Sequence, residues 1–242
     1  MPRLDQVESF REQLDDLNRA QVARLIQLWS RLIGRPDDYV RDALVAEFPQ
    51  LVDVFAGAAS DLTAEWYDSL AATEAFRARP APLPPPDQLE SSTRWAAAAL
   101  ASGTTTSPVE RLAGTAQRAL FNASRQTVEL NVEREGAGWA RYASANACEF
   151  CRMLATRGSV YGSKAAATSV VGRGRAGRTR GNQSLGSTYH DHCRCMAVPV
   201  RAGDTYEPPG YVEDWAAQYT QARAAADGVG TKSILAAWRQ LS

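Results

Sequence analysis

Long apolar runs are missing from this chain, and residues that bind soft metal ions are scarce. Among 242 residues there are only four cysteines and two histidines. No run of about 18 apolar residues occurs, so we expect no membrane span, and we expect no apolar signal segment. The formal net charge is zero, yet 45% of the residues are apolar, which is enough for a core in one or two domains.

The scarce residues are gathered in one stretch. All four cysteines and both histidines lie within 48 consecutive positions, from Cys148 to Cys195. They form a CxxC motif and then the run His-Asp-His-Cys-Arg-Cys. Thiolate sulfur and imidazole nitrogen are the ligands that zinc prefers, and a CxxC on a tight turn can point both sulfurs at one ion. The pattern predicts a structural Zn²⁺ site with six candidate ligands for four places, of which Cys148, Cys151, His190, Cys193 and Cys195 are favoured over His192.

The same cysteines and histidines have three other interpretations, each of which fits the pattern less well. A disulfide framework is typical of small secreted domains, and this chain is mid-sized. A redox CxxC would leave His190, Cys193 and Cys195 without a role. Four unrelated buried cysteines would not be clustered in this way. Within the zinc interpretation, Cys193 and Cys195 compete for one place because they point to the same side of an extended segment, and His192 is the weakest candidate.

Basic residues are concentrated around the same stretch. Residues 150–201 hold nine arginines and lysines against one acid, so this segment carries +8 and the rest of the chain −8. Within it, residues 172–187 are low in complexity, and glycines alternate with arginines from 172 to 181. Nothing apolar is available there to bury, so we expect a basic loop. It either forms a solvated surface or contacts nucleic acid through Arg173, Arg175, Arg178 and Arg180.

The first part of the chain has the pattern of long amphipathic helices. Apolar residues recur at three and four from 4 to 33, which predicts one helix of about 45 Å that ends at Gly34 and Pro36. Helical periodicity continues over 37–77, where Pro49 is expected to start or kink a helix and Gly57 and Ser60 are possible interruptions. The short connection at Gly34 predicts antiparallel packing of the two segments.

Five segments follow from the changes in composition. A helical region (1–78) is followed by a proline-rich linker (79–87), expected to be a semi-rigid spacer, and by a second helical region (88–137) in which Ser107-Pro108-Val109-Glu110 is a capping box. Residues 138–201 form the predicted zinc module, with a strand at Trp139–Tyr142, a helical turn after Cys151 and a strand at 195–200. Residues 202–242 form a helical tail. The fold class is therefore α+β, with a mainly helical N-terminal region.

Several motifs of the 107–201 region resemble one family. They are Trp139-Ala140-Arg141-Tyr142, the CxxC at Cys148 and Cys151, the Arg157–Tyr161 turn, and the run from Tyr189 to Val200 that contains HxxCxC. Together they resemble the MuF-type minor head (head morphogenesis) proteins of tailed phages, in the version found in phages of actinobacteria. The family's cysteine pair falls on Cys148 and Cys151, and its HxxCxC on His190, Cys193 and Cys195.

The resemblance implies a structural minor capsid protein of the virion. Such a protein lies at the portal vertex or in the capsid interior, contacts the portal and major capsid proteins, and acts in head assembly or in DNA packaging and delivery. Two alternatives are a capsid maturation protease and a zinc-containing nucleic-acid-binding module. A protease role lacks a base, because Ser-His catalysis needs a free histidine and both histidines lie in the metal motif. We therefore expect no enzymatic activity.

Overall fold

The computed structural model describes residues 2–70, 76–102, 107–157 and 193–241. Within these ranges the chain is mainly helical, with one small two-stranded sheet. It divides into two compact units. The helical unit is built mainly of residues 6–130, and the sheet unit of residues 131–157 and 194–241. The division predicted from composition into five segments stays a prediction. None of the described helices is long and apolar enough to cross a membrane.

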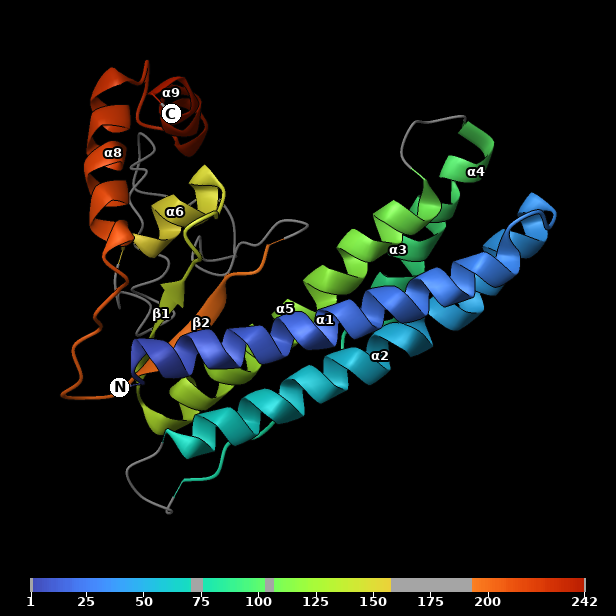
Figure 1. Cartoon of the computed structure of the whole chain (residues 1–242), viewed down its shortest axis with the longest axis horizontal. Helices are drawn as coiled ribbons and strands as arrows, with labels where there is room; N and C mark the ends of the chain where they lie inside the picture. Colours follow the sequence, from blue (N-terminus) through green and yellow to red (C-terminus); the bar gives the residue numbers. More distant parts are fainter. Residues whose placement is uncertain (1, 71–75, 103–106, 158–192, 242) are drawn as a thin grey trace, which may run out of the picture. The chain divides into compact units, whose positions relative to one another are not determined.

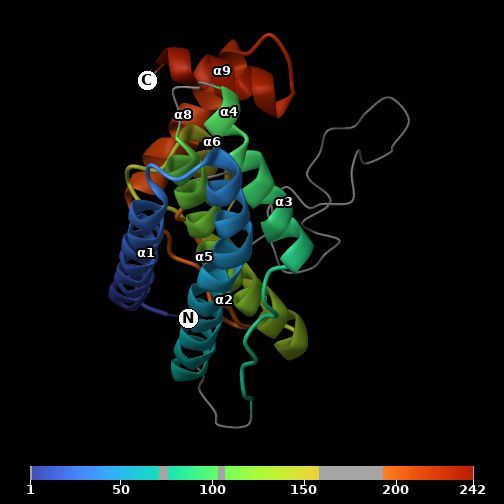
Figure 2. The ribbon, with the colours of Figure 1, turned by 90° about the vertical axis from the view of Figure 1, so that its right-hand side faces the viewer.

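Two long helices, α1 (Leu4–Leu32) and α2 (Asp37–Ser69), form a hairpin in the helical unit. They lie side by side in Figures 1 and 2, and the stacked rings of Phe10 and Trp66, 4.3 Å apart, join their far ends. Contrary to expectation, α2 runs unbroken through Pro49, Gly57 and Ser60. Interior proline costs roughly 3 kcal/mol. Burial of α2 along its length against the unit offsets that cost.

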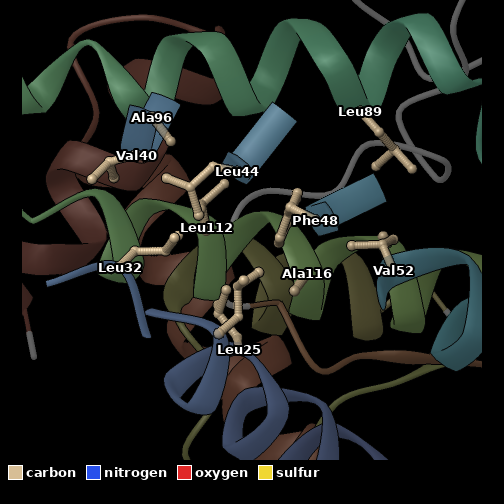
Figure 3. Close-up of a cluster of buried hydrophobic side chains, with 12 residues drawn as sticks. Leu25, Leu32, Val40, Leu44, Phe48, Val52, Leu89, Ala96, Leu112 and Ala116 are labelled. Atoms are coloured by element: carbon tan, nitrogen blue, oxygen red, sulfur yellow. The ribbon is translucent and has the colours of Figure 1, made fainter. Parts of the chain in front are cut away.

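The core of the helical unit is a cluster of leucines and other apolar side chains contributed by four helices. Figure 3 shows these side chains pointing toward one another from α1, α2, α3 and α5. Leu25, Leu44, Phe48, Val52 and Leu112 have no measurable exposure. Burying each such side chain stabilises the folded state by about 1.5–3 kcal/mol. The apolar periodicity predicted for this region is therefore used to form a core.

The proline-rich segment packs along the helical unit, which differs from the expected spacer. The Ala81 amide donates to Oγ1 of Thr127 (3.0 Å), and the Ala78 amide donates to Oδ1 of Asp68 (2.8 Å). Proline has few amides to satisfy, so two side-chain acceptors are enough to dock an extended segment. Its last residues begin α3 (Pro86–Ala97), which is followed by the short α4 (Ala99–Ser102).

Helix α5 (Pro108–Glu135) begins at the predicted capping box. The Ser107 amide donates to Oε2 of Glu110 (2.9 Å), and the Glu110 amide donates to Oγ of Ser107 (3.3 Å). Each side chain thus satisfies an amide that has no partner within the helix. The start of this helix is confirmed to the residue.

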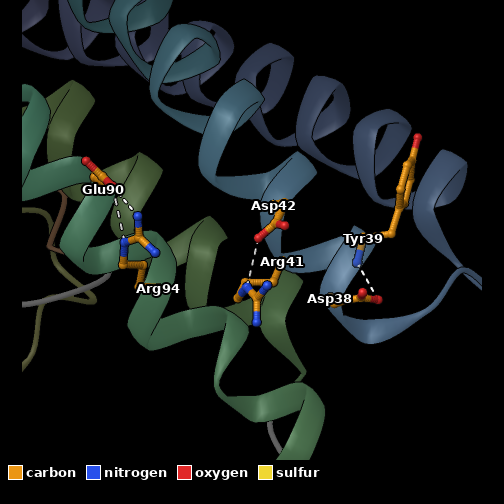
Figure 4. A network of polar contacts seen from close by, with 6 residues as sticks. All are labelled: Asp38, Tyr39, Arg41, Asp42, Glu90 and Arg94. Carbon is orange, nitrogen blue, oxygen red and sulfur yellow. Dashed lines mark hydrogen bonds and ion pairs between the residues drawn. The ribbon is translucent and has the colours of Figure 1, made fainter.

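Exposed polar contacts lie at the start of α2 and on the neighbouring α3 (Figure 4). Arg41 donates to Oδ1 of Asp42 at 2.8 Å, and Arg94 donates to Oε1 of Glu90 one turn earlier on α3. The hydrogen bond from Arg41 and the positive charge of Arg94 lower the pKa of the Asp42 carboxyl. Because these groups are exposed to water, they contribute little to the stability of the unit.

The sheet unit contains two antiparallel strands, β1 (Gly138–Tyr142) and β2 (Met196–Val200). Trp139 lies opposite Pro199, and Tyr142 opposite Met196. The first strand was predicted from Trp139, Tyr142 and the small residues between them, and the second from the alternating faces of residues 195–200. A two-stranded sheet is marginally stable alone, so it needs further packing. β2 is buried at all five positions, which shows that both of its faces are covered.

Three helices complete the sheet unit: α6 (Glu149–Ala155), α8 (Tyr211–Ala225) and α9 (Thr231–Leu241). Helices α8 and α9 form a pair beside α6 (Figure 1). Trp238 of α9 is fully buried, and its Nε1 donates to Oε1 of Gln218 on α8 (3.2 Å). The two C-terminal helices thus pack onto their own chain, as expected for helices that carry buried aromatic residues.

Candidate metal centre

The CxxC motif lies in the first turn of α6 rather than on the tight turn expected before it. Cys148 has extended backbone angles and immediately precedes the helix, and Cys151 lies within it. The Arg152 amide donates to the Cys148 carbonyl (2.9 Å), which closes the first helical turn. Glu149 places a negative charge at the helix N-terminus, where it is favoured. The short helix therefore fixes Cys151 relative to the chain that precedes β2.

Three of the predicted ligands lie together. The sulfur atoms of Cys151, Cys193 and Cys195 are all within 4.8 Å of one another. Cys151 projects from α6, Cys195 directly precedes β2, and Cys193 is two residues before Cys195 along the chain. All three side chains are buried, with exposures of 3%, 2% and 3% respectively. Both cysteines that were expected to compete for one place are thus in the group.

The spacing of these sulfurs fits one bound metal ion. Zinc–sulfur bonds of about 2.3 Å in a tetrahedron place neighbouring sulfurs about 3.8 Å apart. Small side-chain rotations would bring three thiolates from within 4.8 Å to that spacing. None of the four cysteines forms a disulfide in the structure. The group can hold a metal ion through three soft ligands.

A buried arginine lies next to one of the sulfurs. Nη1 of Arg125 donates to Sγ of Cys193 at 3.9 Å, and Nη2 donates to Oδ1 of Asn122 at 2.6 Å. Only 1% of Arg125 is exposed. A cysteine must be a thiolate to bind metal, and a guanidinium donor stabilises that negative charge. Arg125 is 23 residues before the first cysteine, and no feature of the sequence pointed to it.

The remaining predicted site residues are placed differently or fall outside the description. Cys148 is exposed and is not one of the three grouped cysteines. His190 and the excluded candidate His192 lie outside the described residues, as do the four arginines of the Gly/Arg segment. The fourth ligand therefore stays a prediction, with Cys148 and His190 as its candidates.

Contacts from the two C-terminal helices hold α6 in place. The guanidinium of Arg152 lies over the ring of Trp215 in α8, 5.5 Å from its centre, and its Nε donates to the Ala147 carbonyl (2.6 Å). On the other helix, Arg239 forms an ion pair with Glu149 (3.6 Å). No motif in the sequence identified α6 as the element that these helices contact.

Comparison with known proteins identifies the family of the chain. The family model described as VG15 protein matches residues 1–222, which is most of the chain. No curated protein matches, and no solved structure matches. A match of this extent covers the helical unit and the part of the sheet unit that holds the three grouped cysteines, and it ends within α8. The chain therefore belongs to the VG15 protein family, and this membership indicates a phage protein.

Proposed function

We propose that the chain is a structural minor capsid or head morphogenesis protein of a tailed phage, in which one zinc ion stabilises the sheet unit. The observation that carries this proposal is the group of three buried thiols within a chain that belongs to a phage protein family. The resemblance of its CxxC and HxxCxC motifs to MuF-type minor head proteins supports the finer assignment.

The ligand set favours a structural zinc over a catalytic one. A catalytic zinc keeps an open position for water or substrate, whereas structural sites are closed and rich in cysteine. The three grouped thiols are buried, and a fourth ligand from Cys148 or His190 would fill the tetrahedron. When bound, the ion supplies a cross-link between α6 and the start of β2. We therefore propose a role without enzymatic activity.

The proposed partners are the portal protein and the major capsid protein, with the capsid interior or portal vertex as the location. Packaged DNA is a further partner, through the arginines of the Gly/Arg segment. The support for DNA contact is the +8 charge of residues 150–201. Positive segments of this kind bind the phosphate backbone in a salt-dependent way.

Three measurements test the proposed function. Mass spectrometry of purified virions should detect the chain at a few copies per particle, and immobilised portal protein should retain it from solution. Incubation with major capsid protein should produce no cleavage. Absence from virions together with failure to bind portal would contradict the assignment, and specific cleavage would favour the protease alternative.

The fourth ligand can be identified with two variants, Cys148→Ser and His190→Ala. Loss of a ligand lowers zinc affinity strongly, so we expect one variant to lose zinc to a competing chelator at least tenfold more readily than the native chain. The other variant should match the native chain. Equal retention of zinc by both variants would mean that the protein does not supply the fourth ligand from either position.

A further inference from the structure

A groove runs between α1 and α2 in the helical unit. It encloses about 480 Å³ and is lined by four residues from each helix. The α1 side contributes Arg24, Gln27, Leu28 and Arg31, and the α2 side contributes Glu47, Leu51, Val54 and Phe55. The groove does not involve the cysteines, so its role is separate from that of the metal centre.

The floor of the groove is apolar and only partly covered. Leu28 is buried, Leu51 and Phe55 are partly exposed, and Val54 is 69% exposed. The first and last lining residues of α1, Arg24 and Arg31, are seven residues apart, which corresponds to about 10 Å of helix. Anchors at i, i+3 or i+4, and i+7 of a bound helix span the same length. The groove thus has the dimensions of a short helix-binding site.

The two walls of the groove differ in charge. The α1 wall contributes Arg24 and Arg31 and no acid, whereas the α2 wall contributes Glu47. Arg31 forms an ion pair across the groove with Glu47 (2.8 Å), whereas Arg24 donates to the amide oxygen of Gln27 (3.2 Å). No carboxylate in the described part of the chain lies within ion-pair distance of Arg24. This wall therefore favours a negative charge on whatever occupies the groove.

We propose that the α1/α2 groove binds an amphipathic helix of a partner protein that carries acidic side chains along one edge. Its apolar face would cover Leu51, Val54 and Phe55, and its acidic edge would lie against Arg24. The inference does not depend on the proposed head-assembly role, because it rests on the shape and charge of the helical unit alone.

Other occupants fit these observations less well. DNA has no apolar face to cover Val54. The Gly/Arg segment of the same chain carries the charge of the α1 wall and would be repelled by it. A second copy would bring its own Arg24 and Arg31 to the interface, although self-association remains a measurable outcome.

The test uses the full chain and a synthetic helical peptide of about 14 residues. The peptide carries leucines at i, i+4 and i+7 and glutamates along one edge, and a matched peptide carries lysines in place of the glutamates. Fluorescence anisotropy should show binding of the glutamate peptide and binding at least tenfold weaker of the lysine peptide. Val54→Asp should weaken binding at least tenfold, because a charge replaces an apolar contact.

Two further variants separate binding from folding. Arg24→Glu should weaken binding of the glutamate peptide and strengthen binding of the lysine peptide. Ile26→Asp is the matched control: Ile26 is 52% exposed on α1 but does not line the groove, so binding should be unchanged. Circular dichroism should show native helix content in all three variants. No binding of the glutamate peptide, equal binding by Val54→Asp, or sedimentation showing a dimer that Val54→Asp disrupts would overturn the proposal.

Discussion

The helical unit and the sheet unit are stabilised in different ways. The helical unit has helices of 29 and 33 residues, whose leucine-rich faces form an extended core. The sheet unit has two strands of five residues, and helices of 7, 15 and 11 residues. Buried apolar area is sufficient for the first. The second is a small assembly of short elements, and short elements usually need a cross-link such as a metal ion.

The ion pairs do not separate the two units in this way. In the helical unit the pairs of Arg41 and Arg94 lie on the surface, whereas the pair of Arg11 with Asp15 (3.4 Å) is largely covered, with side-chain exposures of 21% and 13%. In the sheet unit the pair of Arg201 with Glu135 (2.9 Å) is covered to a similar degree, with side-chain exposures of 17% and 21%. The comparison therefore predicts that substitutions of the grouped cysteines, rather than polar substitutions, distinguish the sheet unit from the helical unit.

The largest expected effect is the loss of the metal. Cys195→Ser, or a strong chelator, should unfold the sheet unit because metal binding contributes roughly 10 kcal/mol to the folding of small structural zinc sites. Hydrogen exchange should show amides of β1, α6 and β2 exchanging rapidly while those of α2 stay protected. Retained protection of the β2 amides after complete removal of metal would contradict a stabilising role of the ion in the sheet unit.

Truncation of a large buried apolar side chain should instead destabilise the helical unit and leave the metal centre intact. Phe48→Ala removes a fully buried ring from the helical unit and should lower its free energy of unfolding by about 3–5 kcal/mol. Zinc content should stay unchanged. Chemical denaturation followed by circular dichroism gives the stability, and metal analysis of the same sample gives the control. Loss of zinc in this variant would show that the two units do not fold independently.

A smaller effect is expected at the start of α5. Ser107→Ala removes the hydroxyl that accepts a hydrogen bond from the Glu110 amide, and it should lower the free energy of unfolding by about 1 kcal/mol. Ser30→Ala is the matched control, since the Ser30 hydroxyl only donates to the Ile26 carbonyl within α1. Its effect should be near zero. Equal destabilisation by the two substitutions would argue against a specific contribution from the cap.

The smallest effects concern ion pairs. Glu135→Gln should cost about 1 kcal/mol because the pair with Arg201 is mostly covered. Asp42→Asn should leave the melting temperature unchanged near neutral pH. The pKa of Asp42 is lowered in the folded state, so any stabilisation is present above the normal carboxyl pKa and is lost as the pH falls through the lowered value. A clear loss of stability in Asp42→Asn at pH 7 would contradict this ranking.

Local patterns in the sequence predicted the elements whose causes are local. The start of α5 follows from Ser107 and Glu110, and the two strands follow from short runs of aromatic and aliphatic residues. The passage of α2 through Pro49 depends instead on packing by residues far away in the sequence. The docking of the proline-rich segment depends in the same way on Thr127 and Asp68, whose roles no local pattern reveals.

For the same reason, the sequence predicted only part of the candidate site. Spacing of cysteines identified the residues that meet, and the structure groups Cys151, Cys193 and Cys195. The neighbouring groups Arg125, Trp215 and Arg239 are ordinary residues of helices, and their positions near the cysteines or α6 arise from tertiary packing. Such contributions leave no motif, because the contact is made between segments that are distant in sequence.

The central claim is that one metal ion is held by the grouped cysteines, and native mass spectrometry of the full chain tests it most directly. We expect one zinc ion per native chain and none in Cys195→Ser. Thiol reagents should modify fewer than four cysteines of the native chain until a chelator is added. A native chain without metal, in which all four thiols react at once, would contradict it.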